Sequence, residues 1–182
     1  WQGNPDWAAV AGSGISFAIT KATQGIGYLN PTFARNWHEM KAAGLVRGAY
    51  HFAEPDENRP EEEADYFLAN VKRVGGVTAG DLLALDLEDY QGSLSRANDV
   101  MGWALAFMRR VEAETGIRPL LYTNPSILTE QSAFGYPALA HYPLWLAAYQ
   151  ASQPPAPAPW DRVSIWQFTD KGVVPGISGA VD

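Results

Sequence analysis

LLALDLED, residues 82–89, is an apolar run that ends in acidic residues, and it predicts a buried strand. Side chains alternate along a strand, so its odd-numbered leucines share one face, which needs a covering layer of helices. Asp86 and Glu88 share the opposite face, at the carboxyl end of the strand. In parallel α/β folds, functional sites are built at this end. The stretch therefore predicts a helix-covered sheet and the place of a site on it.

Strand and helix signals alternate on both sides of this stretch. Proline at the first helical position and glycine after the last are typical helix boundaries. We expect helices over residues 30–44, 60–74 and, from a Ser95 cap, 95–115, and strands over residues 16–23, 46–53, 82–89, 119–124, 144–149 and 164–169. Residues 125–142 are expected to form a loop with one short helix. Four strand–helix alternations imply parallel pairing with right-handed crossovers.

This alternation fits either an open doubly wound sheet or a barrel. A full eight-unit barrel needs about 250 residues, and this chain has 182. After the proline-rich residues 153–159, the expected strand follows without a helix, and residues 173–181 suggest another strand or hairpin. No G-x-G-x-x-G or P-loop follows any strand, which weakens nucleotide-binding interpretations. No linker divides the chain, so residues 1–182 are expected to form one domain.

The composition excludes several classes of protein. With 47% hydrophobic and 18% charged residues, the chain is neither disordered nor a membrane bundle. It has no cysteine, which excludes disulfides and thiol nucleophiles. A formal net charge of −7 argues against nucleic acid or an anionic membrane as a partner. The histidines His38, His51 and His141 lack metal-ligand spacing, so no metal or other cofactor is expected.

Asp86 and Glu88 form the clearest chemical signal in the chain. Residues two apart in a strand have Cα atoms about 6.6–7 Å apart. Carboxylates at this separation oppose each other's ionisation, so one keeps its proton to higher pH, as a general acid requires. Hydrolysis of glycosidic bonds uses such a pair. The plainer alternative is a strand end that carries acidic residues into solvent.

Aromatic residues gather at the ends of the neighbouring strands. Tyr50 and Phe52 share a face of one strand, Trp145 and Tyr149 share a face of another, and Tyr122 lies near the end of a third. Each ring taken alone is explained by packing in the core. Together with the carboxylate pair, they predict a cleft that stacks on sugar rings.

The order of motifs resembles the glycoside hydrolase family 25 lysozymes, which are the muramidases of bacteria, fungi and phage endolysins. The resemblance spans the chain and is carried by WQG at 1–3, ITKATQG at 19–25, RGAYHFA at 47–53, LDLE at 85–88, LLYTN at 120–124, PLWLAAY at 143–149, IWQF at 165–168 and GISGAVD at 176–182. It implies a reduced TIM-like α/β barrel of about five β/α units followed by closing strands without helices.

The resemblance also implies an activity, which is hydrolysis of the β-1,4 bond between N-acetylmuramic acid and N-acetylglucosamine in peptidoglycan. Glu88 matches the general acid/base, Asp86 its carboxylate partner and Asp182 a further acid of the site. Positions that match the cleft lining are Tyr50, Phe52, Tyr122, Trp145, Tyr149 and Gln167, with Gln24 at the rim. We expect retention through attack by the substrate's own acetamido group, while a direct Asp nucleophile stays open. The expected partner is the peptidoglycan glycan strand. We expect the protein to be a monomer that acts outside the cell or in the cell wall.

Two departures from the family pattern matter. The usual D-V-S-x before W-Q-G is absent, so we expect a domain truncated at its N-terminus, with an Asp four positions before Trp1. Gln24 stands where the family often has Glu, which removes a charge from the cleft rim. Two other functions stay open: a non-catalytic module that binds wall glycans, and a chitinase-type glycosidase. Asp81, Asp86 and Glu88 fit the D-x-x-D-x-D-x-E pattern of the latter, which Ala84 breaks.

Overall fold

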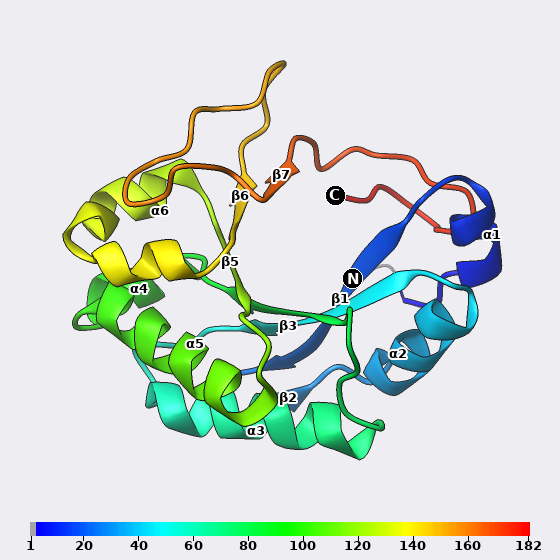
Figure 1. Ribbon diagram of the computed structural model, residues 1–182, viewed down its shortest axis with the longest axis horizontal. Helices are drawn as coiled ribbons and strands as arrows, with labels where there is room; N and C mark the ends of the chain where they lie inside the picture. The colour runs from blue at the N-terminus through cyan, green and yellow to red at the C-terminus, as the bar shows by residue number, and fades with distance from the viewer. Residues whose placement is uncertain (1–2) are drawn as a thin grey trace.

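The computed structural model describes residues 3–182 as a mixed α/β fold built on one seven-stranded sheet (Figure 1). The strand order is β2-β1-β3-β4-β5-β6-β7. The strands are β1 (Phe17–Gln24), β2 (Tyr28–Leu29), β3 (Val46–Phe52), β4 (Leu82–Asp86), β5 (Leu120–Thr123), β6 (Leu144–Ala147) and β7 (Ile165–Gln167). Neighbours from β1 through β7 pair in parallel, as predicted, whereas the short β2 folds back antiparallel on the end of β1.

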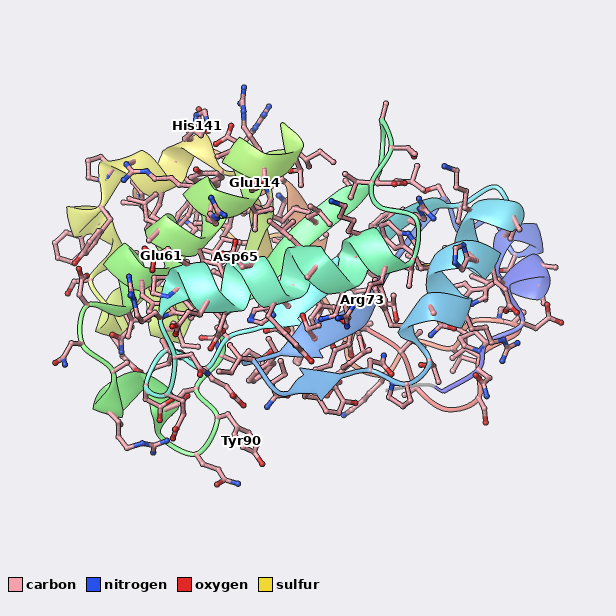
Figure 2. The ribbon with its side chains drawn as sticks, turned by 90° about the horizontal axis from the view of Figure 1, so that it is seen from below. Glu61, Asp65, Arg73, Tyr90, Glu114 and His141 are labelled. Carbon is pink, nitrogen blue, oxygen red and sulfur yellow. The ribbon has the colours of Figure 1, made fainter. Side chains whose placement is uncertain are left out.

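Helices connect the parallel strands and cover the sheet. They are α1 (Trp7–Gly12), α2 (Phe33–Ala42), α3 (Pro60–Arg73), α4 (Ser93–Arg96), α5 (Val100–Thr115), α6 (Pro125–Glu130) and the 3₁₀ turns η1 (Ala133–Gly135) and η2 (Pro137–His141). Figure 2 shows α3 and α5 side by side, with Asp65 and Glu114 on their outer faces. Arg110 of α5 bonds both carboxylates, at 2.8 and 2.9 Å. No helix within residues 3–182 is long and apolar enough to cross a lipid bilayer.

Local side-chain bonds decide where the helices begin. Helix α3 begins at Pro60 after Arg59, as predicted, with three glutamates in its first turn. Helix α2 begins at Phe33, later than predicted, because the Asn30 side chain accepts hydrogen bonds from the backbone and hydroxyl of Thr32 and holds a turn there. The predicted helix from Ser95 is in fact two helices, α4 and α5.

Asp99 explains the break between α4 and α5. It has a left-handed backbone (φ 47°), and its side chain accepts a hydrogen bond from the backbone N–H of Gly102 at 3.0 Å, which caps α5. Ser95 lies inside α4, where its hydroxyl donates to the carbonyl of Gly92. The prediction that Ser95 caps the long helix is therefore wrong, and the cap is Asp99.

The core lies between the leucine face of the sheet and the helices. Leu83, Leu85 and Leu87 have no exposed surface and belong to the same buried cluster as Phe67 of α3 and Phe107 of α5. The predicted helix layer over the leucine row is therefore confirmed. Burial of side chains of this size contributes about 1.5–3 kcal/mol each.

A buried ion pair holds the start of β3 near the start of β4. The Arg47 guanidinium donates to both oxygens of Asp81, at 3.0 and 2.9 Å, and lies 3.8 Å from the ring centre of Trp37. Asp81 also accepts from the backbone N–H of Thr78 at 2.7 Å. This cluster belongs to the end of the sheet away from Asp86, so Asp81 does not share a site with the acidic pair.

The predicted closure into a barrel is not confirmed, because the sheet is open over residues 3–182. Strand β7 has only three residues and pairs with β6 alone, and only the last two residues of β1 pair on their outer side, with β2. Beyond β7, the chain contributes one isolated antiparallel bridge, Gly172 with Val181, and runs back beside α1 (Figure 1). The predicted strand or hairpin over 173–181 is reduced to this bridge.

Candidate active site

The segment from Asp86 to Glu88 is held on both sides by the neighbouring strands. The Asp86 carbonyl accepts from the backbone N–H of Ala53, after β3, and Leu87 donates its N–H to the carbonyl of Tyr122 on β5, both at 2.9 Å. Strand β4 ends at Asp86, so Glu88 lies in the loop beyond the paired sheet. Both carboxylates are therefore presented at the carboxyl end of β4 by a fixed backbone.

Asp86 is buried, with 7% of its surface exposed. Its Oδ1 atom is fully covered and has no hydrogen-bond partner among the described residues. Burial raises the pKa of Asp86 well above its usual value, and the neighbouring Glu88 raises it further, while the Lys21 ammonium opposes both effects. The surroundings of Asp86 therefore disfavour its ionised form.

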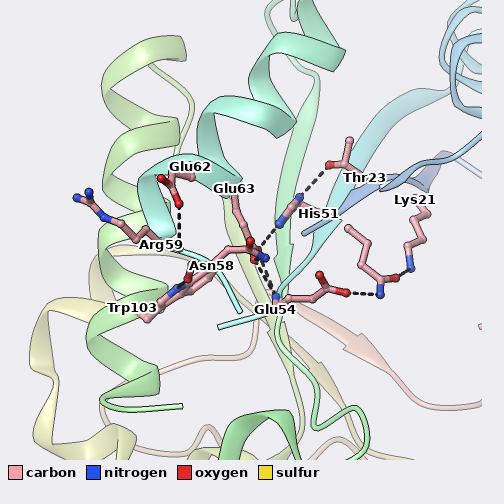
Figure 3. Close-up of polar contacts among 10 residues, drawn as sticks. Lys21, Thr23, His51, Glu54, Asn58, Arg59, Glu62, Glu63 and Trp103 are labelled. Carbon is pink, nitrogen blue, oxygen red and sulfur yellow. Dashed lines mark hydrogen bonds and ion pairs between the residues drawn. The ribbon is translucent and has the colours of Figure 1, made fainter. Parts of the chain in front are cut away.

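The ammonium group of Lys21, on β1, interacts electrostatically with Asp86 and Glu88 as their counterion. It is buried, and its pKa is lowered by burial, against the attraction of Asp86, Glu54 and Glu88. Its ammonium donates to the Gln24 amide oxygen at 2.6 Å, and the Gln24 amide nitrogen donates to Glu54 at 2.7 Å. Gln24 therefore links a cation and an anion as a neutral bridge, in the chain of bonds drawn between Lys21 and Glu54 in Figure 3.

A buried histidine–glutamate pair supports the loop that carries Glu54. His51 Nε2 lies 2.7 Å from Glu63, and its Nδ1 lies 2.8 Å from the Thr23 hydroxyl (Figure 3). Glu63 also accepts from the backbone N–H of Glu54 and from Asn58 at 2.9 Å. Burial lowers the pKa of His51, so the ring is neutral, donates from Nε2 to Glu63 and accepts from Thr23 at Nδ1.

Tyr122 forms the opposite wall beside Glu88. Burial, together with the negative charges of Glu88 and Asp86, raises the pKa of its phenol. Its ring packs against Trp145 of β6, with centroids 4.7 Å apart in an edge arrangement. The amide of Gln167 lies 3.2 Å from the Tyr122 hydroxyl and 3.1 Å from that of Tyr149.

Two hollows meet at Glu88. The larger, of about 730 Å³, extends into the gap between β1 and β7. Its lining includes Lys21, Tyr50, Phe52, Asp86, Glu88, Tyr90, Tyr122, Trp145, Gln167 and Asp182. The second, of about 610 Å³, runs from Glu88 and Asp89 towards α6. Glu88 and Asp89 line both hollows, so the space continues past Glu88 on two sides.

The sequence model described as glycosyl hydrolases family 25 matches residues 1–177. The chain belongs to glycosyl hydrolase family 25. It is 36% identical to the N,O-diacetylmuramidase of Chalaropsis sp, with all of this chain and 92% of that protein covered. It is 32% identical to lysozyme M1 of Streptomyces globisporus, again over the whole chain, and spans 63% of the length of that relative.

Solved structures of family 25 agree with this assignment. The bacterial lysozyme of Streptomyces coelicolor superposes with a TM-score of 0.88 at 33% identity, covering all of this chain and 86% of the other. The muramidase of Trichobolus zukalii gives 0.80 at 31% identity, covering 98% and 87%. The family 25 chain therefore shares its fold with these proteins along nearly its whole length.

The structure brings most of the predicted site residues of the family 25 chain to one cavity. Those that line it are Asp86, Glu88, Asp182, Tyr50, Phe52, Tyr122, Trp145 and Gln167. Gln24 and Tyr149 are outside this lining and touch it through Lys21 and Gln167 respectively. Burial and Asp170 raise the pKa of Asp182. Within residues 3–182, no group of three or more His, Asp or Glu side chains is placed to share a metal ion.

Two residues of the site were missed from the sequence. Lys21 lies within the motif ITKATQG. A charged lysine inside a strand that is predicted to be buried indicates a functional position. Tyr90 follows the acidic end of LLALDLED; it is exposed, lines the cavity and packs edge-on against Phe52, with ring centroids 6.3 Å apart. In Figure 2, Tyr90 extends from its loop away from the helices. The bond from Arg96 to Asp56, at 2.9 Å, ties this loop to the one after β3.

The buried charge of Asp86 should lower the stability of the folded chain at neutral pH. A carboxyl group whose folded pKa is raised contributes stability below its unfolded pKa, about 3.8, and that contribution is lost as the pH rises through the folded pKa. We therefore expect Asp86→Asn to raise the melting temperature at pH 7 by at least roughly 2–4 °C. The gain should shrink towards pH 3.8, and a gain that is equal at both pH values in calorimetry would contradict the burial of a charge here.

Proposed function

We propose that the chain is a lysozyme that hydrolyses the β-1,4 bond between N-acetylmuramic acid and N-acetylglucosamine in peptidoglycan, with residues 1–182 acting as one catalytic domain. The observation that carries this proposal is the pairing of a buried Asp86, whose Oδ1 lacks a partner within residues 3–182, with Glu88 in an aromatic-lined cleft. Membership of family 25 and the lysozymes and muramidases among the relatives support it.

The proposed reaction proceeds with retention and uses the substrate as the nucleophile. The acetamido oxygen of the sugar on the non-reducing side attacks its own anomeric carbon, while Glu88 gives its proton to the departing oxygen. Asp86 accepts the acetamido N–H and stabilises the positive oxazolinium-like intermediate. Glu88 then takes a proton from the water that opens this ring. The Oδ1 atom of Asp86 supports this role, because it is a buried acceptor without a partner among the described residues and the acetamido N–H would supply its donor.

The remaining residues have supporting roles in this proposal. The rings of Tyr50, Phe52, Tyr122 and Trp145 supply apolar faces for the sugars, and Tyr90 extends that wall beyond Phe52. Lys21 offsets the negative charge of the acidic pair. Asp182 lines the same cavity, where its negative charge contributes to the raised pKa of Asp86. Relatives named autolytic lysozyme and phage lysozyme support a place of action at the cell wall.

Digestion of purified cell walls tests the proposal. We expect loss of turbidity, with new reducing ends on N-acetylmuramic acid, and no comparable cleavage of chitin oligomers. Preferential cleavage of chitin would favour a chitinase-type glycosidase. Sedimentation of the protein with walls without any new reducing ends would favour a non-catalytic binding module.

A further inference from the structure

Gln167, at the end of β7, lies beneath two tyrosines of the cleft. Only 6% of its surface is exposed. Its side-chain nitrogen Nε2 reaches the hydroxyl of Tyr122, on β5, and that of Tyr149, just after β6. One amide group therefore joins the ends of three neighbouring strands beside Glu88.

The chemistry of an amide nitrogen fixes the direction of both phenol protons. Nε2 carries two N–H groups and has no lone pair to accept a hydrogen bond. Both phenol oxygens must therefore accept from Gln167, and their own O–H protons point elsewhere. The O–H of Tyr122 is then left to point towards Glu88, which lines the same hollow and interacts with this phenol. Tyr149, with 55% of its surface exposed, keeps its proton for solvent or a ligand at the cleft rim.

We propose that Gln167 is a positioning residue, which orients Tyr122 to donate to the Glu88 carboxylate and Tyr149 to donate to the bound sugar. This inference rests on the proposed lysozyme reaction. The donation matters after Glu88 has passed its proton to the leaving oxygen, because the carboxylate that remains then has a fixed donor. Gln167 thus acts through the tyrosines, whereas the sequence predicted direct contact with the substrate.

Gln167→Glu tests this role because it keeps the shape and replaces a double donor with an acceptor. Both phenols would then turn their protons towards residue 167, and Glu88 would lose its donor. We expect kcat to fall roughly tenfold and the alkaline limb of the pH–rate profile to move to higher pH. The titratable groups that face Glu88 stay unchanged in the variant; they are Asp86 on β4, Lys21 on β1, Tyr50 on β3, Tyr122 on β5 and Tyr149 after β6.

A double-mutant cycle separates this route from a direct effect of the new charge. In a Tyr122→Phe background the phenol proton directed to Glu88 is already absent and only that of Tyr149 can be redirected, so Gln167→Glu should lower kcat by no more than about twofold. An equal loss of kcat in both backgrounds would overturn the proposal. Circular dichroism and thermal melts of each variant confirm that the comparison is made between folded proteins.

Titration of Tyr149 gives a second readout that needs no activity. Donation from Gln167 lowers the pKa of this phenol, against the effect of burial. Gln167→Met removes both donors at similar size and without charge, so it should raise the pKa of Tyr149, measured as tyrosinate absorbance relative to Tyr149→Phe. An unchanged titration overturns the positioning role. An inactive wild type with the expected titration shift would contradict the proposed function and leave the orientation of the phenols standing.

Discussion

Glu88→Gln should lower the rate of wall hydrolysis by at least ~10²-fold while leaving the fold intact. The amide cannot give a proton to the leaving oxygen or take one from the attacking water. The backbone around it is fixed by the hydrogen bond from Leu87 to Tyr122. The substitution should therefore remove the ionisable group without moving the side chain. Initial rates of reducing-end release, with circular dichroism of the variant, measure both parts of this expectation.

The matched control is Glu57→Gln, which changes the same group at an exposed position outside both hollows. Its rate should stay within about twofold of the wild type, since surface substitutions away from a site change little. A folded Glu88→Gln variant that clears walls like the wild type would remove Glu88 from the reaction and require another acid.

Glu63→Ala should lower the free energy of unfolding by at least about 3 kcal/mol, because each buried donor left without an acceptor costs about 1–3 kcal/mol. Glu63 and His51 have no exposed surface, and the substitution leaves three buried or partly buried donors without an acceptor: His51 Nε2, the Glu54 N–H and the Asn58 amide. Urea denaturation measures the loss. The loop after β3 should also exchange its amide hydrogens faster, because its bonds to Glu63 hold it in place.

Glu61→Ala serves as the comparison for this stability effect. Glu61 lies two residues earlier in the first turn of α3 and makes only a long, exposed contact with Arg59 at 3.6 Å. Its removal should change the unfolding free energy by no more than about 0.5 kcal/mol. Equal losses for the two variants would show that the buried pair contributes nothing beyond helix charge.

The local pattern was sufficient to predict the elements whose signals lie within a few residues. The alternation in LLALDLED predicted β4, and Arg59-Pro60 predicted the start of α3. The sequence does not predict the division between α4 and α5, because the cap at Asp99 requires a left-handed backbone and no neighbouring residue indicates that conformation. Whether the sheet closes depends on which edges meet in space, and alternation along the chain carries no information about that.

The site was predictable to the extent that it lies at strand ends. Asp86, Glu88 and the aromatic rings share a cavity because parallel strands end at the same edge of the sheet. Three hydrogen bonds depend on the fold and have no sequence spacing that reveals them: the one from Gln24 to Glu54 and the two from Gln167. They join residues from different strands or from the loops after them, so only the register of the sheet brings them together.

The two hollows that meet at Glu88 bear on how a long polymer would be cut. A pocket closed at one end would admit only the tip of a chain and release small sugars one after another. In the proposed reaction a glycan strand would lie across Glu88 with sugars continuing in both directions, so scission would occur at internal bonds. Each such event would divide a load-bearing strand in two, and a wall under turgor would fail mechanically when only a small fraction of its linkages had been hydrolysed.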